Sequence, residues 1–152
     1  MSHIADEPIP PVVISSMLNN NWNEYSGHIP KPTFIVPNDG VTPLRENLTT
    51  ADYVYVTLDT PGYEEIPIGN WSYVNRRYKV LLQLRTRNGR QRLYNLFREI
   101  RRVTHSQIHS LADYQRVRFE SFNELFNEDF NIWDARIIIS LENAAVAFET
   151  TG

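Results

Sequence analysis

The sequence RRYKVLLQLRTRNGRQRLYNLFREIRR, residues Arg76 to Arg102, contains a strand pattern and a helix pattern separated by one turn. In its first part, apolar and polar side chains alternate, which is typical of a strand with one buried face. Asn88-Gly89 follows, a dipeptide suited to the positive φ angles of a tight turn. Apolar residues then recur with helical spacing, at Leu93, Leu96, Phe97, Ile100 and Val103. We expect the helix to pack against the sheet that contains the strand, because neither apolar face can stay in water.

The same stretch is strongly basic, although the whole chain has a net charge of −3. It holds ten of the fifteen lysine and arginine residues and a single acidic residue, Glu99. The rest of the chain has five basic and seventeen acidic residues. This division of charge favours binding to an acidic partner or to a second copy of the chain.

The composition indicates a single domain over residues 1–152, since 41% hydrophobic and 22% charged residues are ordinary for a globular protein of this length. There is no cysteine, which excludes a disulfide framework and thiol chemistry. No secretory signal and no apolar run of membrane-spanning length is present, so no membrane partner is expected. Residues 1–9 and 143–152 are predicted to be loose tails.

Two elements precede the first convincing strand. Pro10-Pro11 opens a predicted helix that presents its apolar side chains to the core and ends at Gly27. Its apolar positions are Val13, Ile14, Met17, Leu18, Trp22 and Tyr25. Lys31–Pro37 is bounded by prolines and is therefore expected to be an edge strand or a packed loop.

Tyr53–Asp59 is β-branched and aromatic, and we predict that this strand stops at Thr60-Pro61-Gly62. Residues 60–72 are expected to form a projecting arm, either flexible or the tip of a long hairpin. Ile66, Ile68 and Trp71 make this arm too apolar for a free surface loop. We therefore predict an arm that is mobile in the isolated subunit and ordered in an assembly.

The C-terminal part predicts two more strands. Tyr114–Glu120 alternates, and the acidic segment Ser121–Asp129 follows it. Asn131–Leu141 is a nearly continuous apolar run, which favours an interior strand. The whole pattern predicts an α+β fold with a mixed, largely antiparallel sheet of four or five strands packed against two main helices.

No pattern in the sequence indicates catalysis. His105 and His109 have a spacing that can bind a metal, but no third ligand accompanies them, and exposed histidines are the favoured interpretation. The adjacent acids Glu64-Glu65 and Glu128-Asp129 would point to opposite faces of a strand. We expect no enzyme activity, no metal and no cofactor.

Nucleic-acid binding is an alternative interpretation of the basic stretch. Phosphate contacts would come from six arginines on the strand and the helix: Arg77, Arg85, Arg87, Arg98, Arg101 and Arg102. The aromatic residues Tyr78 and Phe97 fall on the predicted core faces, where they cannot stack on bases. A solvated basic face, or one that contacts another subunit, is favoured over this alternative.

The order of elements from Pro11 to Leu141 resembles that of tail terminator and related neck proteins of long-tailed bacteriophages. The resemblance lies in an N-terminal amphipathic helix, the strand YVYVTLDT, an arm, the stretch RRYKVLLQLRTRNGRQRLYNLFREIRRV and a closing pair of strands. The proline-rich segment Ile29–Pro43 departs from the pattern. The resemblance is one of element order and size, with no shared motif.

This resemblance implies a structural virion protein that forms a ring, commonly a hexamer, at the junction of head and tail. Its partners would be copies of itself, the tail tube protein, neck or connector proteins, and genomic DNA passing through the ring lumen. A head-completion or adaptor subunit on the portal side is the structural alternative.

A ring needs two different complementary surfaces on each copy. In our prediction, three arginines of the helix meet acidic residues of the neighbour, and the arm reaches across by strand addition. The residues expected in these contacts are Arg98, Arg101 and Arg102 on one copy and Glu124, Glu128 and Asp129 on the next, with Arg77, Arg85, Arg87 and the arm residues Ile66, Ile68 and Trp71 as further interface residues.

Overall fold

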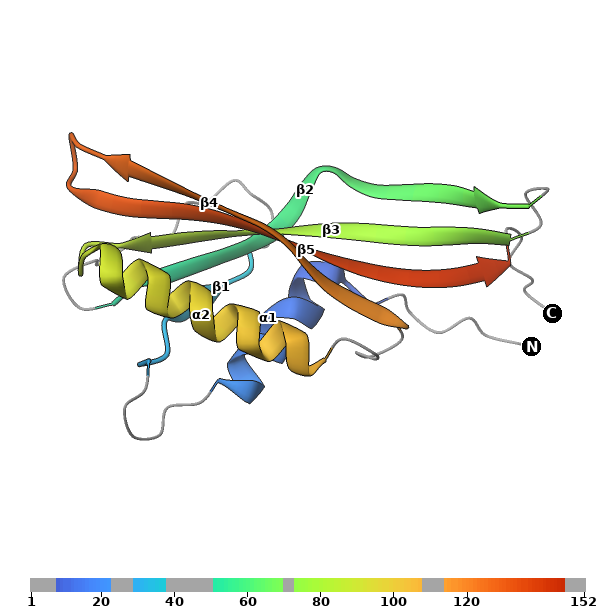
Figure 1. The fold of residues 1–152 in the computed structure, drawn as a ribbon, viewed down its shortest axis with the longest axis horizontal. Helices are drawn as coiled ribbons and strands as arrows, with labels where there is room; N and C mark the ends of the chain where they lie inside the picture. Colours follow the sequence, from blue (N-terminus) through green and yellow to red (C-terminus); the bar gives the residue numbers. More distant parts are fainter. Residues whose placement is uncertain (1–7, 23–28, 38–50, 70–72, 108–113, 147–152) are drawn as a thin grey trace.

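The computed structural model describes residues 8–22, 29–37, 51–69, 73–107 and 114–146. Within these residues the chain forms two helices and five strands (Figure 1). They follow the order α1 (Pro10–Asn21), β1 (Thr33–Ile35), β2 (Tyr53–Ile68), β3 (Tyr73–Thr86), α2 (Arg90–Ser106), β4 (Arg116–Asn127) and β5 (Ile132–Val146). The predicted α+β class with a mixed five-stranded sheet and two helices is confirmed.

The strands lie in the order β1-β2-β3-β5-β4. Only the β1–β2 pair is parallel, and the other three pairs are antiparallel. β5 lies between β3 and β4, which explains the nearly continuous apolar run of its sequence. The helix α2 carries the chain from β3 past β5 to β4.

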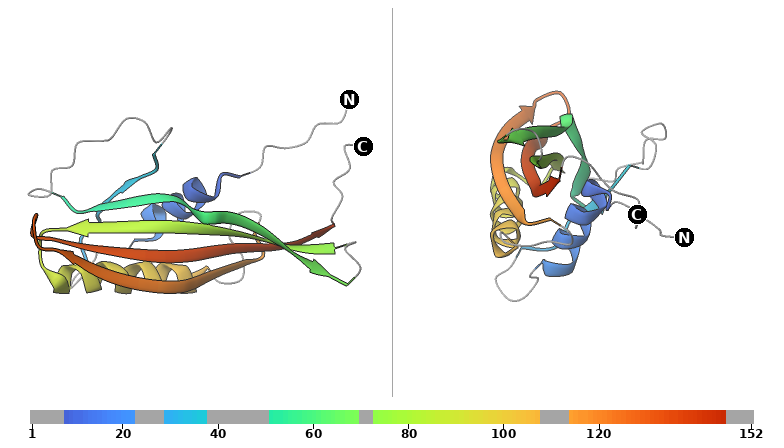
Figure 2. Two further views of the ribbon diagram at one scale, coloured as in Figure 1. Left: turned by 90° about the horizontal axis from the view of Figure 1, so that it is seen from above. Right: turned by 90° about the vertical axis from the view of Figure 1, so that its right-hand side faces the viewer.

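Both helices pack on the same face of a strongly curved sheet (Figure 2). Side chains that alternate along the strands meet the apolar faces of the helices. The fully buried members include Val80, Leu82 and Leu84 of β3, Ile137 and Ile139 of β5, Leu96 and Ile100 of α2, and Ile14 and Leu18 of α1. Neither described helix covers the opposite face, which carries polar side chains such as Gln83, Arg85 and Arg136.

The first helix is shorter than predicted. It ends at Asn21, and Trp22 already has an extended backbone. The indole Nε1 of Trp22 donates a hydrogen bond of 2.8 Å to the carbonyl oxygen of Ile29, and the ring meets Phe34 edge-on. Trp22 thus packs against the next segment instead of continuing the helix. Tyr25 and Gly27, also assigned to this helix, lie outside the described residues.

The prediction that the second strand stops at Thr60-Pro61-Gly62 is wrong. β2 continues to Ile68, through a register shift in which Leu58 pairs with Val80 and Tyr63 with Tyr78. The intervening residues form a bulge that takes the cis Thr60–Pro61 peptide out of the ladder. Residues 60–68, predicted as part of an arm, are therefore mostly strand, and the β2–β3 hairpin extends together with β5 beyond the helices (Figure 1).

The last two strands are also longer than predicted. β4 runs to Asn127, with a second register shift between Phe119 and Ser121. β5 runs to Val146, so residues 143–146 are not a loose tail, because they pair with β3. At the other end, the carbonyl of Pro8 accepts a hydrogen bond from Tyr114 and Ile9 caps α1, while residues 1–7 and 147–152 lie outside the described residues.

Candidate interaction surfaces

The outer face of α2 is basic and exposed. Its apolar side chains are buried against the sheet, whereas Arg98 and Arg101 point to solvent, as does Arg87 at the end of β3. The guanidinium of Arg101 lies 5.0 Å from the centre of the Phe97 ring. No ion pair is found for Arg87 or Arg98 within the described part of the chain.

Arg102, the third predicted interface arginine of α2, is bound within its own subunit. Its Nε donates 2.8 Å to Glu99, and its Nη2 donates 2.9 Å to the carbonyl of Asn21 at the end of α1. The bond to Glu99 raises the pKa of Arg102 above its ordinary value. Arg102 therefore fastens the two helices together while neutralising the buried Glu99.

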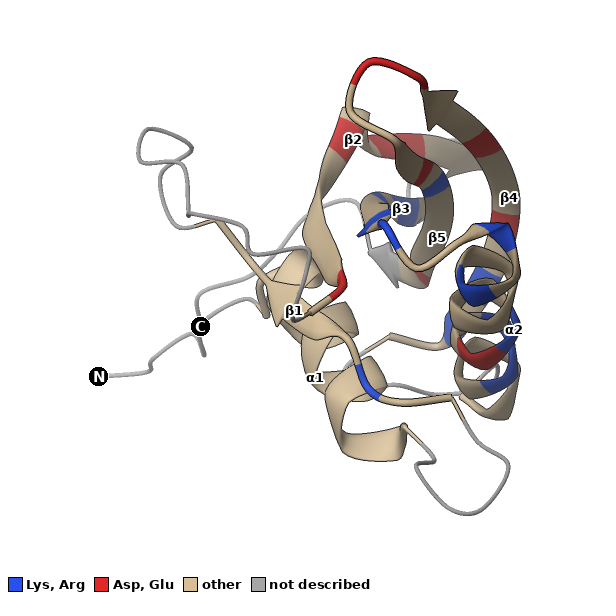
Figure 3. Cartoon of the chain, turned by 90° about the vertical axis from the view of Figure 1, so that its left-hand side faces the viewer, with Lys and Arg blue, Asp and Glu red and all other residues tan. Residues whose placement is uncertain are grey.

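The predicted acidic partners lie at the far end of β4. Glu124 accepts two hydrogen bonds from Arg90, one of them 3.2 Å from Nε, and this bonding lowers the pKa of Glu124. Glu128 and Asp129 are exposed in the turn between β4 and β5. Figure 3 shows this acidic turn at one end of the sheet and the positions of the basic residues along α2. The two charged surfaces are separate on one subunit, and their contact between subunits stays a prediction.

The arm carries exposed apolar side chains. Ile66 and Ile68 are 42% and 47% exposed on β2, and Tyr73 is 57% exposed at the start of β3. Trp71 lies outside the described residues. The ends of β2 and β3 that carry them extend beyond the helices (Figure 1), and apolar side chains exposed on a projecting segment normally have a partner.

A row of alternating charge crosses the helix-free face of the sheet; we call it the charge row. It consists of Glu64 on β2, Arg77 on β3, Glu142 on β5 and Arg116 on β4, which are aligned by the strand register. Arg77 lies 3.3 Å from Glu64 and 3.1 Å from Glu142, and Arg116 lies 3.7 Å from Glu142. Glu142 is 3% exposed. The predicted interface residue Arg77 thus binds within its own sheet.

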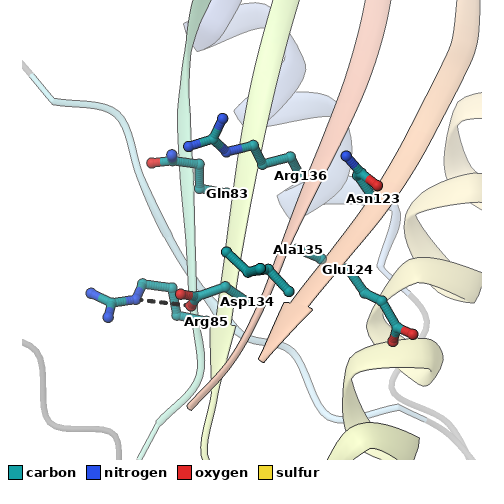
Figure 4. A pocket seen from close by; sticks show the side chains of 8 residues that line it. Gln83, Arg85, Asn123, Glu124, Asp134, Ala135 and Arg136 are labelled. Atoms are coloured by element: carbon teal, nitrogen blue, oxygen red, sulfur yellow. Dashed lines mark hydrogen bonds and ion pairs between the residues drawn. The ribbon is translucent and has the colours of Figure 1, made fainter. Parts of the chain in front are cut away.

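The same face contains a hollow of about 440 Å³ near the β4–β5 turn (Figure 4). Within it, Arg85 donates a 3.1 Å hydrogen bond to Asp134. The other lining residues are Gln83, Asn123, Glu124, Leu125, Ala135 and Arg136. The carboxylate of Asp134 faces Arg85 within the hollow, whereas Glu124 turns away from it toward α2, where it binds Arg90 (Figure 4).

Sequence reasoning missed a polar junction at Asp52, which is 5% exposed. The Asp52 carboxylate accepts hydrogen bonds from Thr86 at 2.5 Å, Asn88 at 2.9 Å and Arg92 at 2.6 Å. Arg92 also donates to the carbonyl of Pro30. The junction therefore ties β2, the end of β3, the turn and the first turn of α2 together.

Of the two histidines whose spacing can bind a metal, only the first lies within the described residues. His105 is exposed at the end of α2, and His109 lies outside the described residues. Among the residues that the structure does describe, no group of three or more potential metal ligands occurs. No helix in this part of the chain is long and apolar enough to span a membrane.

Comparison with known proteins adds no family assignment. No protein-family model matches this chain. No curated protein matches its sequence either.

Proposed function

We propose that this chain is a structural subunit that forms a ring at the head–tail junction of a long-tailed bacteriophage, as a tail terminator. The element order resembles that class, and the exposed apolar side chains of the arm carry the proposal. Ile66 and Ile68 lie on a strand that extends past the helical layer, where a neighbouring subunit or a tail tube can cover them. The separate basic and acidic surfaces supply the two unlike faces that a ring requires.

The assembly state tests this proposal. Light scattering at several concentrations and electron microscopy are expected to show rings, either alone or after purified tail tubes are added. Binding to tubes supports the terminator, whereas binding to DNA-filled heads alone indicates a head-completion adaptor. A protein that stays monomeric with tubes and with heads overturns the proposal.

Replacing Ile66 and Ile68 with serine tests the arm directly. Burying each isoleucine in an assembly is worth about 1.5–3 kcal/mol, so the double variant is expected to stay folded and to lose assembly. Val12→Ser is the matched control, because Val12 is 44% exposed on α1, away from the arm. Unfolding of the double variant would assign the arm to the subunit's own core, and normal assembly would show that the arm has no role in it.

A further inference from the structure

We propose that copies of this chain join head to tail by strand addition, with the start of β4 of one copy pairing with the β2 segment Tyr63–Ile66 of the next. This inference deepens the proposed ring function and rests on it. The sequence prediction placed α2 against the acidic turn of the neighbour and had the arm reach across by strand addition; the present inference names the two sheet edges that would pair.

Both edges of the sheet have open positions. In the part of the chain that the structure describes, β4 has no strand on the side away from β5. β1 pairs with β2 only from Tyr53 to Tyr55, so among the described elements no strand lies beside the outer side of β2 from Val56 to Ile68. Open edges leave backbone N–H and C=O groups unpaired and are ready templates for another strand.

Features that block strand pairing leave one segment on each edge of the sheet that can pair with another strand. Prolines and bulges prevent pairing, and β2 has Pro61 in its bulge and Pro67 near its end. The four residues Tyr63–Ile66 between them contain no proline. On β4, the register shift comes at Phe119–Ser121, which leaves Arg116–Arg118 regular.

The charge row specifies which edges meet. It begins with an acid, Glu64, at the β2 edge and ends with a base, Arg116, at the β4 edge. Joining β4 to β2 of the next copy continues the alternation, because Arg116 then lies beside Glu64 of that copy. Joining two β2 edges symmetrically would place Glu64 opposite or close to its own equivalent, and like charges facing each other across strands are destabilising.

Strand direction and exposure agree with this register. Within one copy β2 runs antiparallel to β4, so a neighbour placed in line across the sheet presents an antiparallel β2. Glu64 then pairs with Arg116, and Glu65 with Gln115, the residue directly before β4, whose N–H already bonds to Glu142 of β5. The side chains of Arg116 and Arg118 are 54% and 46% exposed and lie 3.7 and 4.0 Å from Glu142, so both can reach a second carboxylate. A contact between unlike edges is heterologous and closes into a ring when the rotation allows.

Engineered disulfides test the register, because the natural chain has no cysteine that could interfere. One variant carries Glu64→Cys with Arg116→Cys, and a second carries Glu65→Cys with Gln115→Cys. Neighbouring antiparallel pairs alternate between Cα spacings of about 5.5 and 4.5 Å, both of which a disulfide can bridge, so at least one of the two variants is expected to bring its cysteines into bonding geometry. The controls are each single variant and Glu64→Cys with Arg98→Cys, which puts the second cysteine on the outer face of α2. Circular dichroism and thermal unfolding establish that each variant is folded.

After mild oxidation, one double variant is expected to give a ladder of linked chains on a non-reducing gel, up to the size of the ring. The single variants and the Arg98 control are expected to give no ladder. Rings seen by light scattering and microscopy without a ladder from either pair overturn this inference and leave the proposed function standing. Efficient dimers from Glu64→Cys alone also overturn it, since they show β2 meeting β2. A protein that is monomeric even with tail tubes overturns the inference and the proposed function together.

Discussion

Replacing Asp52 with asparagine is expected to destabilise the subunit more than any other single change of charge at its ion pairs. The substitution keeps the size of the side chain but leaves Arg92, whose side chain is 15% exposed, without its carboxylate. It also turns an acceptor of three hydrogen bonds into a group with two N–H donors of its own. Breaking a buried pair from one side costs about 3–5 kcal/mol, and the residual exposure of Arg92 favours the lower end.

The matched control is Asp134→Asn. Asp134 also binds an arginine at hydrogen-bond distance, but the side chains of this pair are 28% and 30% exposed. Pairs that keep contact with water contribute about 0–1 kcal/mol. Both variants are measured by urea unfolding at one protein concentration, because assembly makes apparent stability depend on concentration.

With a urea dependence of about 1–3 kcal/mol per molar, Asp52→Asn is expected to lower the unfolding midpoint by about 1–3 M. Asp134→Asn is expected to lower it by much less. An Asp52→Asn variant no less stable than Asp134→Asn would refute the reasoning, since the buried junction would then contribute nothing beyond an ordinary surface pair.

Three further changes test the core, the turn and the pH response. Leu96→Ala empties a fully buried position and is expected to cost about 2–5 kcal/mol by thermal unfolding, whereas Leu125→Ala, at a 66% exposed position, changes stability by about 0.5 kcal/mol or less. Gly89→Ala forces a side chain onto a backbone with φ of 96° and is expected to cost about 1–3 kcal/mol, with no loss contradicting a strained turn. Arg90 lowers the pKa of Glu124, so this pair stabilises the fold above the ordinary carboxyl pKa of about 4.3 and the contribution is lost as pH falls through the lowered value. Glu124→Gln should therefore lose less stability than the natural chain between about pH 5 and 3, and identical pH profiles would count against the pair.

The strand–turn–helix unit was predictable because all its information is local. Period two gives way to helical spacing across Asn88-Gly89, and the structure ends β3 at Thr86 and begins α2 at Arg90. Burial at Leu93, Leu96, Ile100 and Val103 follows the same spacing. Where the local preference for a helix or strand agrees with the tertiary contacts in this way, the secondary structure can be predicted from the sequence.

The errors arose where pairing with distant residues decides the outcome. Thr60-Pro61-Gly62 has the composition of a strand end, yet a bulge absorbs it because β3 and β5 continue alongside. Residues 143–146 are a strand for the same reason, since β3 offers them an open edge. The local composition carries no information about the neighbouring strands, so it predicts that β2 and β5 end earlier than they do.

The interaction surfaces were predictable in residue type but not in geometry. The sequence identified Arg77 as a surface residue available to a partner, whereas the strand register sets it between Glu64 and Glu142. Asp52 gave no local signal at all, because its partners Thr86, Asn88 and Arg92 are 34 to 40 residues away. Charges can be counted in a sequence, but the register that pairs them is a property of the folded sheet.

The place of β5 in the sheet has a consequence for synthesis of the chain on the ribosome. β5 is made after β3 and β4, yet it is the strand that joins them. Until it emerges, β3 has one empty side, β4 has no strand partner among the described elements, and the apolar face of α2 has only half of its sheet to cover. A nascent chain that pauses before Ile132 therefore exposes apolar side chains and unpaired strand edges, which favour aggregation. Chaperone binding during expression would protect these surfaces until β5 is made.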